Sequence, residues 1–347
     1  MPVYMALAKN GTIADLVETG TVFREAFCGP CFGAGDTPAN GEFSIRHTTR
    51  NFPNREGSKP GDGQISAVAL MDARSIAATA VNKGILTAAT DICKEEEVEI
   101  DYPFLSTIYD KRVYNGYGKA EPDFELKFGP NIKDWPEQPA LSNDLLVKIV
   151  SHIDDPVTTT DELIPSGETS SYRSNPLKLA EFTLSRRDPE YVGEAKKVAS
   201  GECAEEVKEV YAKLAAAGIV TDAENTNVAS SIYANKPGDG SAREQAASCQ
   251  RVLGGGANFA HEYATKRYRS NCINWGILPF LTDDETKLPK NAWVLVKDIR
   301  NALKNETAIE AYAVGEEVSK INLSLGQLTE DEKDILLDGC LINYYRR

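Results

Sequence analysis

Histidine is scarce in this chain, which contains three histidines and seven cysteines among its 347 residues. Because zinc sites take three or four nitrogen and sulfur ligands, a histidine-rich zinc site is not expected. The cysteines are scattered, and one pair, Cys28 and Cys31, is close in sequence. This spacing is not the disulfide framework of a secreted protein, so we expect reduced thiols.

Basic charge and long apolar runs are also lacking. Lysine and arginine number 38 against 52 acidic residues, a formal net charge of -14, which disfavours nucleic acid as a partner. No apolar run reaches the roughly 20 residues of a membrane helix, and the start, "MPVYMALAKNGT", lacks the features of a signal peptide. We therefore expect a cytoplasmic protein that does not bind membranes. The length suffices for two domains.

The first part of the chain alternates helical patterns with glycine-rich loops. Residues 13–26 have roughly helical apolar spacing, and the alanine-rich segment 65–84 predicts a stronger helix that ends at Gly84. Three prolines in "GPNIKDWPEQPALSND" indicate a linker. We expect a first domain at 1–134, a linker at 135–144 and a second domain at 145–347.

The second part carries clearer patterns. The apolar run "LLVKIVSHI" predicts a buried strand, and residues 204–218 form an amphipathic helical pattern. "WVLVKDI" and "IEAYAVGEEVSKINLSL" are typical of strands. A last helix is expected to begin at Thr329, with Glu332 completing a capping box.

The stretch "AFCGPCFG" admits several interpretations. A redox pair usually opens a helix, but the residues that follow Cys31 have a loop-like composition. A zinc site needs two further ligands, whereas an iron–sulfur site suits a turn built from glycine and proline. Two unliganded loop cysteines are the plain structural interpretation. The residues alone leave these alternatives open.

Two further stretches combine hydroxyls with arginine. In "GDGSAREQAASC", Ser241 and Glu244 predict a capping box at a helix start. A helix N-terminus also attracts anions, and Arg243 is placed unfavourably there against the helix dipole, so its presence needs another reason, of which binding a carboxylate is one. In "SGETSSYRSNP", the hydroxyls suit local turns and Arg173 suits a surface charge.

Together these segments resemble the aconitase family of hydro-lyases. "AFCGPCFG" looks like the family's paired cluster cysteines, and "HTTRNFPNREG" resembles its loop with two substrate arginines. "TTTDELIPSG" followed by "YRSN" resembles the opening of its swivel domain. "GDGSAREQAASCQRVLGG" and "YRSNCINWGILPF" are similar to its G-S-S-R-E-H and R-x-N-x-x-x-x-G-I-L-P segments. The likeness is closest to a hydratase branch of the superfamily, not to the citric-acid-cycle enzyme.

The resemblance implies a fold and a cofactor. The fold would be α/β: an aconitase-like three-layer α/β domain that carries the cluster cysteines, followed by a swivel domain of the β/β/α type. Cys28 and Cys31 would be two of three thiolate ligands of a [4Fe–4S] cluster. Its remaining iron would bind the hydroxyl and a carboxylate of the substrate as a Lewis acid.

The resemblance also implies roles in a β-elimination from a di- or tricarboxylic hydroxy acid. Arg50 and Arg55 would clamp substrate carboxylates, and Arg173 would do the same from the second domain. Ser241 would be the base that removes a proton beside a carboxylate, and Arg243 would stabilise its alkoxide.

The chain departs from the family pattern. Ala242 stands at the family's second serine, Gln245 at its histidine, and Glu162 at the histidine of its Asp-His pair, which places citrate specificity in doubt. The family's N-terminal half, which supplies the third cysteine, has no counterpart here. The resemblance thus implies a C-terminal portion, either a fragment or one half of a split enzyme, with the missing half as its partner. We expect this isolated chain to be inactive and its cluster position empty. A non-catalytic module that binds a carboxylate or docks on a partner is the alternative, and dithiol redox chemistry at Cys28 and Cys31 is a third.

Overall fold

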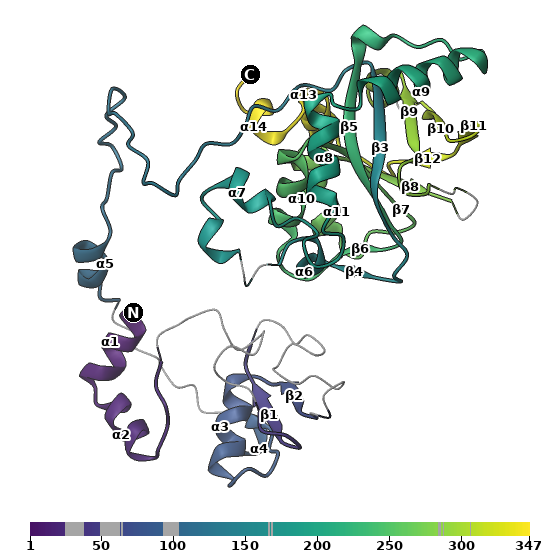
Figure 1. Ribbon diagram of the computed structural model, residues 1–347. Helices are drawn as coiled ribbons and strands as arrows, with labels where there is room; N and C mark the ends of the chain where they lie inside the picture. Colours follow the sequence, from purple (N-terminus) through teal and green to yellow (C-terminus); the bar gives the residue numbers. More distant parts are fainter. Residues whose placement is uncertain are drawn as a thin grey trace. The chain divides into compact units, whose positions relative to one another are not determined.

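The chain forms two compact units, Met1–Phe124 and Glu125–Arg347. A computed structural model describes residues 1–24, 38–48, 63, 65–92, 104–165, 167, 169–283, 286, 288–305 and 307–347 (Figure 1). The division expected from the sequence, with its linker at 135–144, stays a prediction.

The first unit contains short helices and one pair of strands. Strands β1 (Phe43–Arg46) and β2 (Ala67–Leu70) run parallel, with Phe43 opposite Ala67. The helices are α1 (Pro2–Lys9), α2 (Thr12–Glu18), α3 (Ala73–Val81), α4 (Ala89–Ile92) and α5 (Thr107–Arg112). The helix α2 is shorter than the helical pattern at 13–26 suggested.

The helix expected over 65–84 is wrong in its first part. Residues Ala67–Leu70 are strand β2, and α3 begins only at Ala73. The side chain of Asp72 accepts a hydrogen bond from the Ser75 N–H at 2.9 Å and so caps the helix at that point. Pairing with β1 satisfies the backbone of β2, and this tertiary contact overrides the apolar helical pattern.

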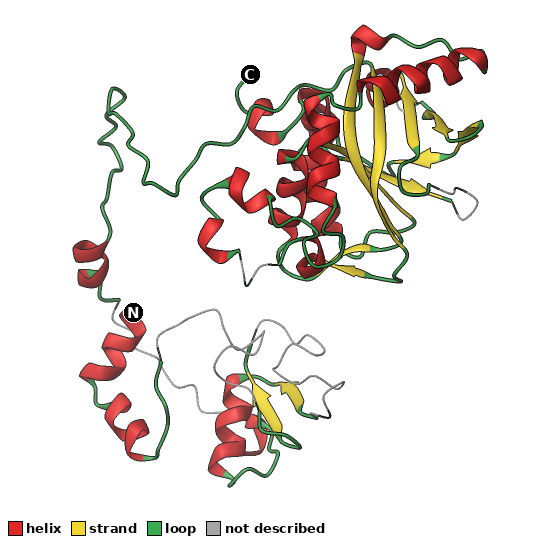
Figure 2. Ribbon diagram, viewed as in Figure 1, coloured by secondary structure: helices red, strands yellow, loops and turns green. Residues whose placement is uncertain are grey.

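The second unit is built on an eight-stranded mixed sheet (Figures 1 and 2). Its strand order is β11-β10-β9-β3-β5-β7-β8-β12. The parallel strands are β3 (Asp144–Ile153), β5 (Thr226–Ala234), β7 (Gly255–Ala260) and β8 (Leu278–Thr282). The antiparallel strands are β9 (Trp293–Lys297), β10 (Glu310–Val314), β11 (Val318–Ile321) and β12 (Leu323–Ser324). A separate parallel pair joins β4 (Thr158–Thr159) to β6 (Pro237–Asp239).

Helices surround this sheet, and the two apolar clusters lie on its opposite faces. The helices are α6 (Thr160–Leu163), α7 (Pro176–Ala180), α8 (Tyr191–Ser200), α9 (Ala204–Ala216), α10 (Arg243–Val252), α11 (Lys266–Asn274), α12 (Ile299–Asn305), α13 (Glu330–Asp338) and α14 (Leu341–Tyr344). Leu146 and Val150 of β3 pack with residues of α8 and α10. Leu145 and Val147 point the other way and pack with α12 and α13. Because both faces are covered, β3 is an almost unbroken apolar run.

One charged residue interrupts that run. The Lys148 side chain is 6% exposed, and its Nζ donates to Glu206 Oε2 of α9 at 2.6 Å. The same Nζ lies 5.8 Å from the centre of the Trp293 ring. The buried ammonium group is therefore neutralised where the helix α9 crosses the sheet.

The strongest patterns of the second unit are confirmed. The buried strand β3, the amphipathic helix α9 with Val210 and Leu214 buried, and the strands from β9 to β12 all form. Thr329 and Glu332 form the expected capping box at α13. The α/β class is confirmed, whereas the arrangement as a third domain plus a swivel domain stays a prediction. Among the described residues, no helix is long and apolar enough to span a membrane.

Candidate active site

The carboxyl ends of four parallel strands meet at one edge of the large sheet. The strands β3, β5, β7 and β8 are neighbours in that order and run in the same direction. In open α/β sheets, ligands bind outside these carboxyl ends. Ser241 lies in the segment 235–242 that leaves β5 at this edge and leads to α10. A ligand site is therefore expected at this edge.

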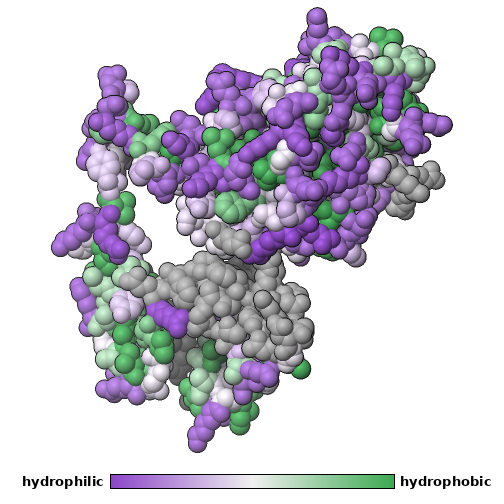
Figure 3. All heavy atoms as spheres, viewed as in Figure 1, coloured by the Kyte–Doolittle hydropathy of each residue, from purple (hydrophilic) through white to green (hydrophobic). Residues whose placement is uncertain are grey.

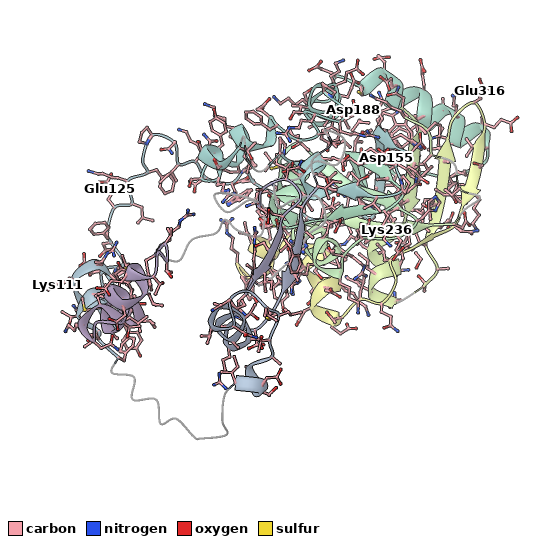
Figure 4. All side chains as sticks on the ribbon, turned by 90° about the horizontal axis from the view of Figure 1, so that it is seen from below. Lys111, Glu125, Asp155, Asp188, Lys236 and Glu316 are labelled. Atoms are coloured by element: carbon pink, nitrogen blue, oxygen red, sulfur yellow. The ribbon has the colours of Figure 1, made fainter. Side chains whose placement is uncertain are left out.

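The segment 235–242 is held from the side of β3. Thr158 N–H donates to the carbonyl of Lys236 at 3.0 Å. Figure 4 labels Lys236, and Asp155 in the segment that follows β3. The hydroxyl of Thr160, which is 1% exposed, accepts from Ala242 N–H at 3.3 Å. The residue next to Ser241 is thus fixed by the first residue of α6.

The segment is also held from the side of β7. Ala264 N–H donates to Pro237 O at 3.0 Å, and Thr265 Oγ1 donates to Gly238 O at 3.1 Å. The ring of Tyr268, which is fully buried, lies directly against Gly238. Gly238 has a φ of +97°, a backbone conformation that favours glycine, and the Tyr268 ring leaves no room for a side chain there. The approach to Ser241 is consequently rigid on both sides.

The expected capping box at Ser241 is wrong. The N-cap of α10 is Ala242, and no side chain caps this helix. Ser241 lies one residue further out, exposed, and its hydroxyl has no hydrogen-bond partner among the residues that the structure describes. Thr160 Oγ1 stabilises this conformation of the turn by accepting a hydrogen bond from Ala242 N–H. The hydroxyl of Ser241 is therefore left available beside the N-terminus of α10.

The two arginines predicted from this part of the chain lie on neighbouring elements. Arg243 is the first residue of α10 and is half-buried. Arg173 is exposed and directly follows the 3-10 turn Ser170–Tyr172. Asn175 then caps α7 by accepting from Lys178 N–H, and α7 packs against α10. The packing of these helices brings the Arg173 segment to the helix that carries Arg243.

Glu162, one of the positions at which the chain departs from the family pattern, takes part in a capping box that was not predicted from the sequence. Thr159 N–H donates to Glu162 Oε2 at 2.7 Å, and Glu162 N–H donates to Thr159 Oγ1 at 3.2 Å. These bonds make a capping box at α6. The pattern Thr-x-x-Glu at 159–162 was the available signal. Glu162 thus stabilises the helix whose first residue, Thr160, positions Ala242.

Glu244 in the first turn of α10 is bound from outside the helix. Trp275 Nε1 donates to Glu244 Oε1 at 3.0 Å, and the ring of Trp135 lies 4.3 Å from that of Trp275. Partial burial of the carboxyl raises the pKa of Glu244, and the bond from Trp275 acts in the opposite direction. The ionised form of Glu244 is therefore less stable in the folded protein than in the unfolded chain.

We expect Glu244→Gln to unfold at the same or higher urea concentration at pH 7, because glutamine keeps the acceptor for Trp275 and removes the charge. A raised carboxyl pKa lowers stability as pH rises from the unfolded pKa through the folded one. The advantage of the variant should accordingly be larger at pH 7 than at pH 4. Urea titrations at both pH values measure it, and a variant that is less stable at pH 7 than at pH 4, relative to wild type, would contradict this assignment.

A second polar cluster at the same edge was not foreseen. Tyr233 OH, from β5, lies 2.7 Å from His261 Nε2 just after β7, and the His152 ring from β3 stacks on Tyr233 at 4.5 Å. His152 Nε2 lies 2.8 Å from Asp154 Oδ1. The segments that carry them, at residues 152–154, 233 and 261, are far apart in sequence, and the order of the strands brings them together.

A model of the aconitase family (aconitate hydratase) matches residues 1–78 of the chain. The resemblance seen in the sequence is thereby confirmed for this part, which contains the pair Cys28 and Cys31 and the arginines Arg50 and Arg55.

Several aconitase-family relatives match parts of the chain. The 3-isopropylmalate dehydratase large subunit of Clostridium beijerinckii is 33% identical over 75 residues, 21% of this chain and 18% of that protein. The 3-isopropylmalate dehydratase large subunit 2 of Rubrobacter xylanophilus is 38% identical over 94 residues, which are 27% of this chain and 21% of that protein. Mitochondrial homoaconitase of Cryptococcus neoformans is 24% identical over 189 residues, which are 54% of this chain and 24% of that protein. The matched parts thus span about a fifth to a quarter of these relatives' length.

Among solved structures, 3-isopropylmalate dehydratase (leuD) of Methanocaldococcus jannaschii aligns with a TM-score of 0.37 and 19% identity. The alignment covers 58% of this chain and 93% of that one. At this TM-score the likeness carries no argument about the site.

The cluster residues implied by the aconitase family lie outside the described residues, as do Arg50 and Arg55. The cysteines that the structure describes, Cys203, Cys249, Cys272 and Cys340, are buried. Burial raises the pKa of the Cys249 and Cys272 thiols to about 12, so both stay protonated. No group of three or more His, Cys, Asp or Glu side chains within the described ranges could hold a metal. None of these four cysteines therefore lies in a described group of metal ligands.

Proposed function

We propose that this chain is part of a hydro-lyase that dehydrates and rehydrates a di- or tricarboxylic hydroxy acid. The coarse assignment to aconitase-family hydratases rests on the match at residues 1–78 and on relatives that are dehydratases or homoaconitases. One structural observation supports the finer proposal. Ser241 stands exposed beside the N-terminus of α10, at the carboxyl edge of the parallel strands, in a segment held from both sides.

Ser241 is the proposed base. Its Oγ takes a proton from the carbon beside a substrate carboxylate while hydroxide leaves the next carbon and a carbon–carbon double bond forms. The N-terminus of α10 and the guanidinium of Arg243 both favour negative charge on that oxygen. Arg173 binds a substrate carboxylate, a task for which the planar guanidinium is suited. These groups supply the proton-abstracting half of a β-elimination.

The complete protein would add the other half. We assign Cys28 and Cys31 to a [4Fe–4S] cluster, with a third thiolate from polypeptide outside this chain, and Arg50 and Arg55 to the substrate carboxylates. A bound cluster would supply Lewis-acid assistance to the departure of hydroxide. A cytoplasmic location is part of the same proposal.

The first unit supports the idea of a missing partner polypeptide. Parallel sheets normally have both faces covered, yet β1 and β2 are a pair of four-residue strands. Many large apolar side chains in this unit are exposed, and the space-filling view shows apolar surface there (Figure 3). They include Phe43, Ile65, Val81, Ile85 and Leu86. We propose that the remaining part of an aconitase-type core, on the same or a separate chain, covers this surface.

Turnover of the complete protein tests the proposal. Purified protein containing the missing part is mixed with hydroxy di- and tricarboxylic acids, and the double bond of the product is followed by its ultraviolet absorbance. We expect turnover with at least one of these acids and none with the present chain alone. A complete, folded protein that converts no member of the panel would contradict the proposed reaction.

The second candidate function is a non-catalytic module that binds a carboxylate. The observation that favours it is Glu162, which stands where the aconitase family has a histidine and whose Oε2 accepts from both Thr159 N–H and Thr159 Oγ1 in the capping box of α6. Ala242 likewise offers no hydroxyl. A module of this kind would bind the acid through Arg173 without converting it.

A further inference from the structure

The segment that enters the second unit contacts two separate parts of the candidate site. Residues 125–143 contain no helix or strand. Within them, Lys133 N–H donates to the carbonyl of Ser174 at 2.9 Å. Ser174 directly follows Arg173 and precedes Asn175, the cap of α7. The first contact is therefore to the backbone beside the proposed carboxylate-binding arginine.

The second contact leads to α10. The Trp135 ring lies 4.3 Å from the Trp275 ring, at an interplanar angle of 42°. Trp275 in turn donates its Nε1–H to Glu244 in the first turn of α10. Trp275 is held in place as the C-cap of α11, and it packs on the apolar cluster beneath. The contact reaches the turn that carries Arg243 and follows Ser241.

The two contacts are close along the chain. Residues 133 and 135 are two peptide units apart, so their backbones are separated by at most roughly 7 Å. A short backbone segment, continued by the side chains of Trp135, Trp275 and Glu244, thus connects the backbone beside Arg173 to the first turn of α10. Neither arginine needs to touch the segment for their separation to depend on it.

We propose that residues 133–135 act as a strut that sets the distance between Arg173 and Arg243, and thereby selects the length of the dicarboxylate that both can bind. The inference rests on the proposed function, which assigns Arg173 to a substrate carboxylate and Arg243 to the proton-abstracting group, and it adds a contact of Arg243 with a second carboxylate. Trp135 and Trp275 are positioning residues in this scheme, and Glu244 is the link between them and α10. Two guanidinium groups held at a fixed separation bind best the ligand whose carboxylates have the same spacing.

The test compares two acids that differ by one methylene group. Succinate and glutarate are titrated into the full chain, and the indole N–H resonance of Trp275, assigned with Trp275→Phe, reports binding. Wild-type protein should favour one acid, since a methylene can be discriminated about tenfold in a fitted site. Trp135→Ala should change the ratio of the two dissociation constants by about threefold or more. Trp135→Phe, which keeps a ring against Trp275, should restore the wild-type ratio.

A matched control and three results decide the question. Phe128→Ala removes another exposed aromatic ring of the same segment and should leave the ratio unchanged. If Trp135→Ala keeps the wild-type ratio although Arg173→Ala weakens binding of both acids, the strut is refuted and the carboxylate site stands. If Phe128→Ala changes the ratio as much as Trp135→Ala does, the strut is refuted as well. If wild-type protein binds neither acid, both the strut and the proposed carboxylate site of this unit are overturned.

Discussion

Replacing Ser241 with alanine in the complete, active protein should lower kcat by about a thousandfold or more, because the base that removes the proton is lost. KM should change little, since the arginines that bind the carboxylates remain. The side chain is exposed and caps no helix, so folding should be unaffected. Steady-state turnover of wild-type and variant protein, with thermal unfolding of both, measures the effect.

Ser200→Ala is the matched control for this change. Ser200 ends α8, is exposed, and donates local hydrogen bonds to Lys197 O and Glu202 Oε1. Its variant should retain wild-type turnover. Unchanged turnover in Ser241→Ala would remove Ser241 from the reaction and favour the carboxylate-binding module instead.

Gly238→Ala should destabilise the second unit by about 3 to 5 kcal/mol, the sum of overpacking and backbone strain. A Cβ at this position would lie 2.2 to 2.5 Å from ring and Cβ atoms of Tyr268. Tyr268 cannot move aside easily, because its hydroxyl accepts from Gln250 Nε2 at 2.9 Å and from Asn258 Nδ2 at 3.2 Å in the buried core. The segment that carries Ser241 should be displaced with it.

Gly218→Ala separates the two contributions in the same unit. Gly218 also has a positive φ, of +77°, but a Cβ there would meet no atom within 4 Å. This control should cost only about 1 kcal/mol. Urea unfolding of both variants measures the difference, and equal losses of stability would show that the contact between Gly238 and Tyr268 is unimportant.

The elements that the sequence predicts well are those whose signal is local. The strand β3 is a long apolar run, α9 has one apolar face, and the box of Thr329 and Glu332 is four residues long. The prediction at β2 failed because its partner β1, whose Phe43 lies opposite Ala67, comes from an earlier part of the chain and supplies the hydrogen bonds that a helix would otherwise make. Asp72, a typical N-cap residue inside the expected helix, was the local signal that the helix begins later.

The candidate site follows the same division. Ser241, Arg243 and Arg173 could be selected from their motifs, and the packing of α7 on α10 brings their segments together. The cap of α10 was mispredicted because Thr160, some eighty residues earlier, occupies Ala242 N–H. The contact of Trp135 with Trp275 likewise depends on tertiary structure that no local pattern encodes.

Anaerobic iron–sulfide reconstitution of the complete protein tests the central claim most directly. Wild-type protein should become brown and bind about four iron atoms per site, as a [4Fe–4S] cluster requires. Cys28→Ser should remain colourless, whereas Cys203→Ser, a buried cysteine of the second unit, should still assemble the cluster. A wild-type protein that stays colourless, or a Cys28→Ser variant that reconstitutes fully, would contradict the assignment of this chain to an iron–sulfur hydro-lyase.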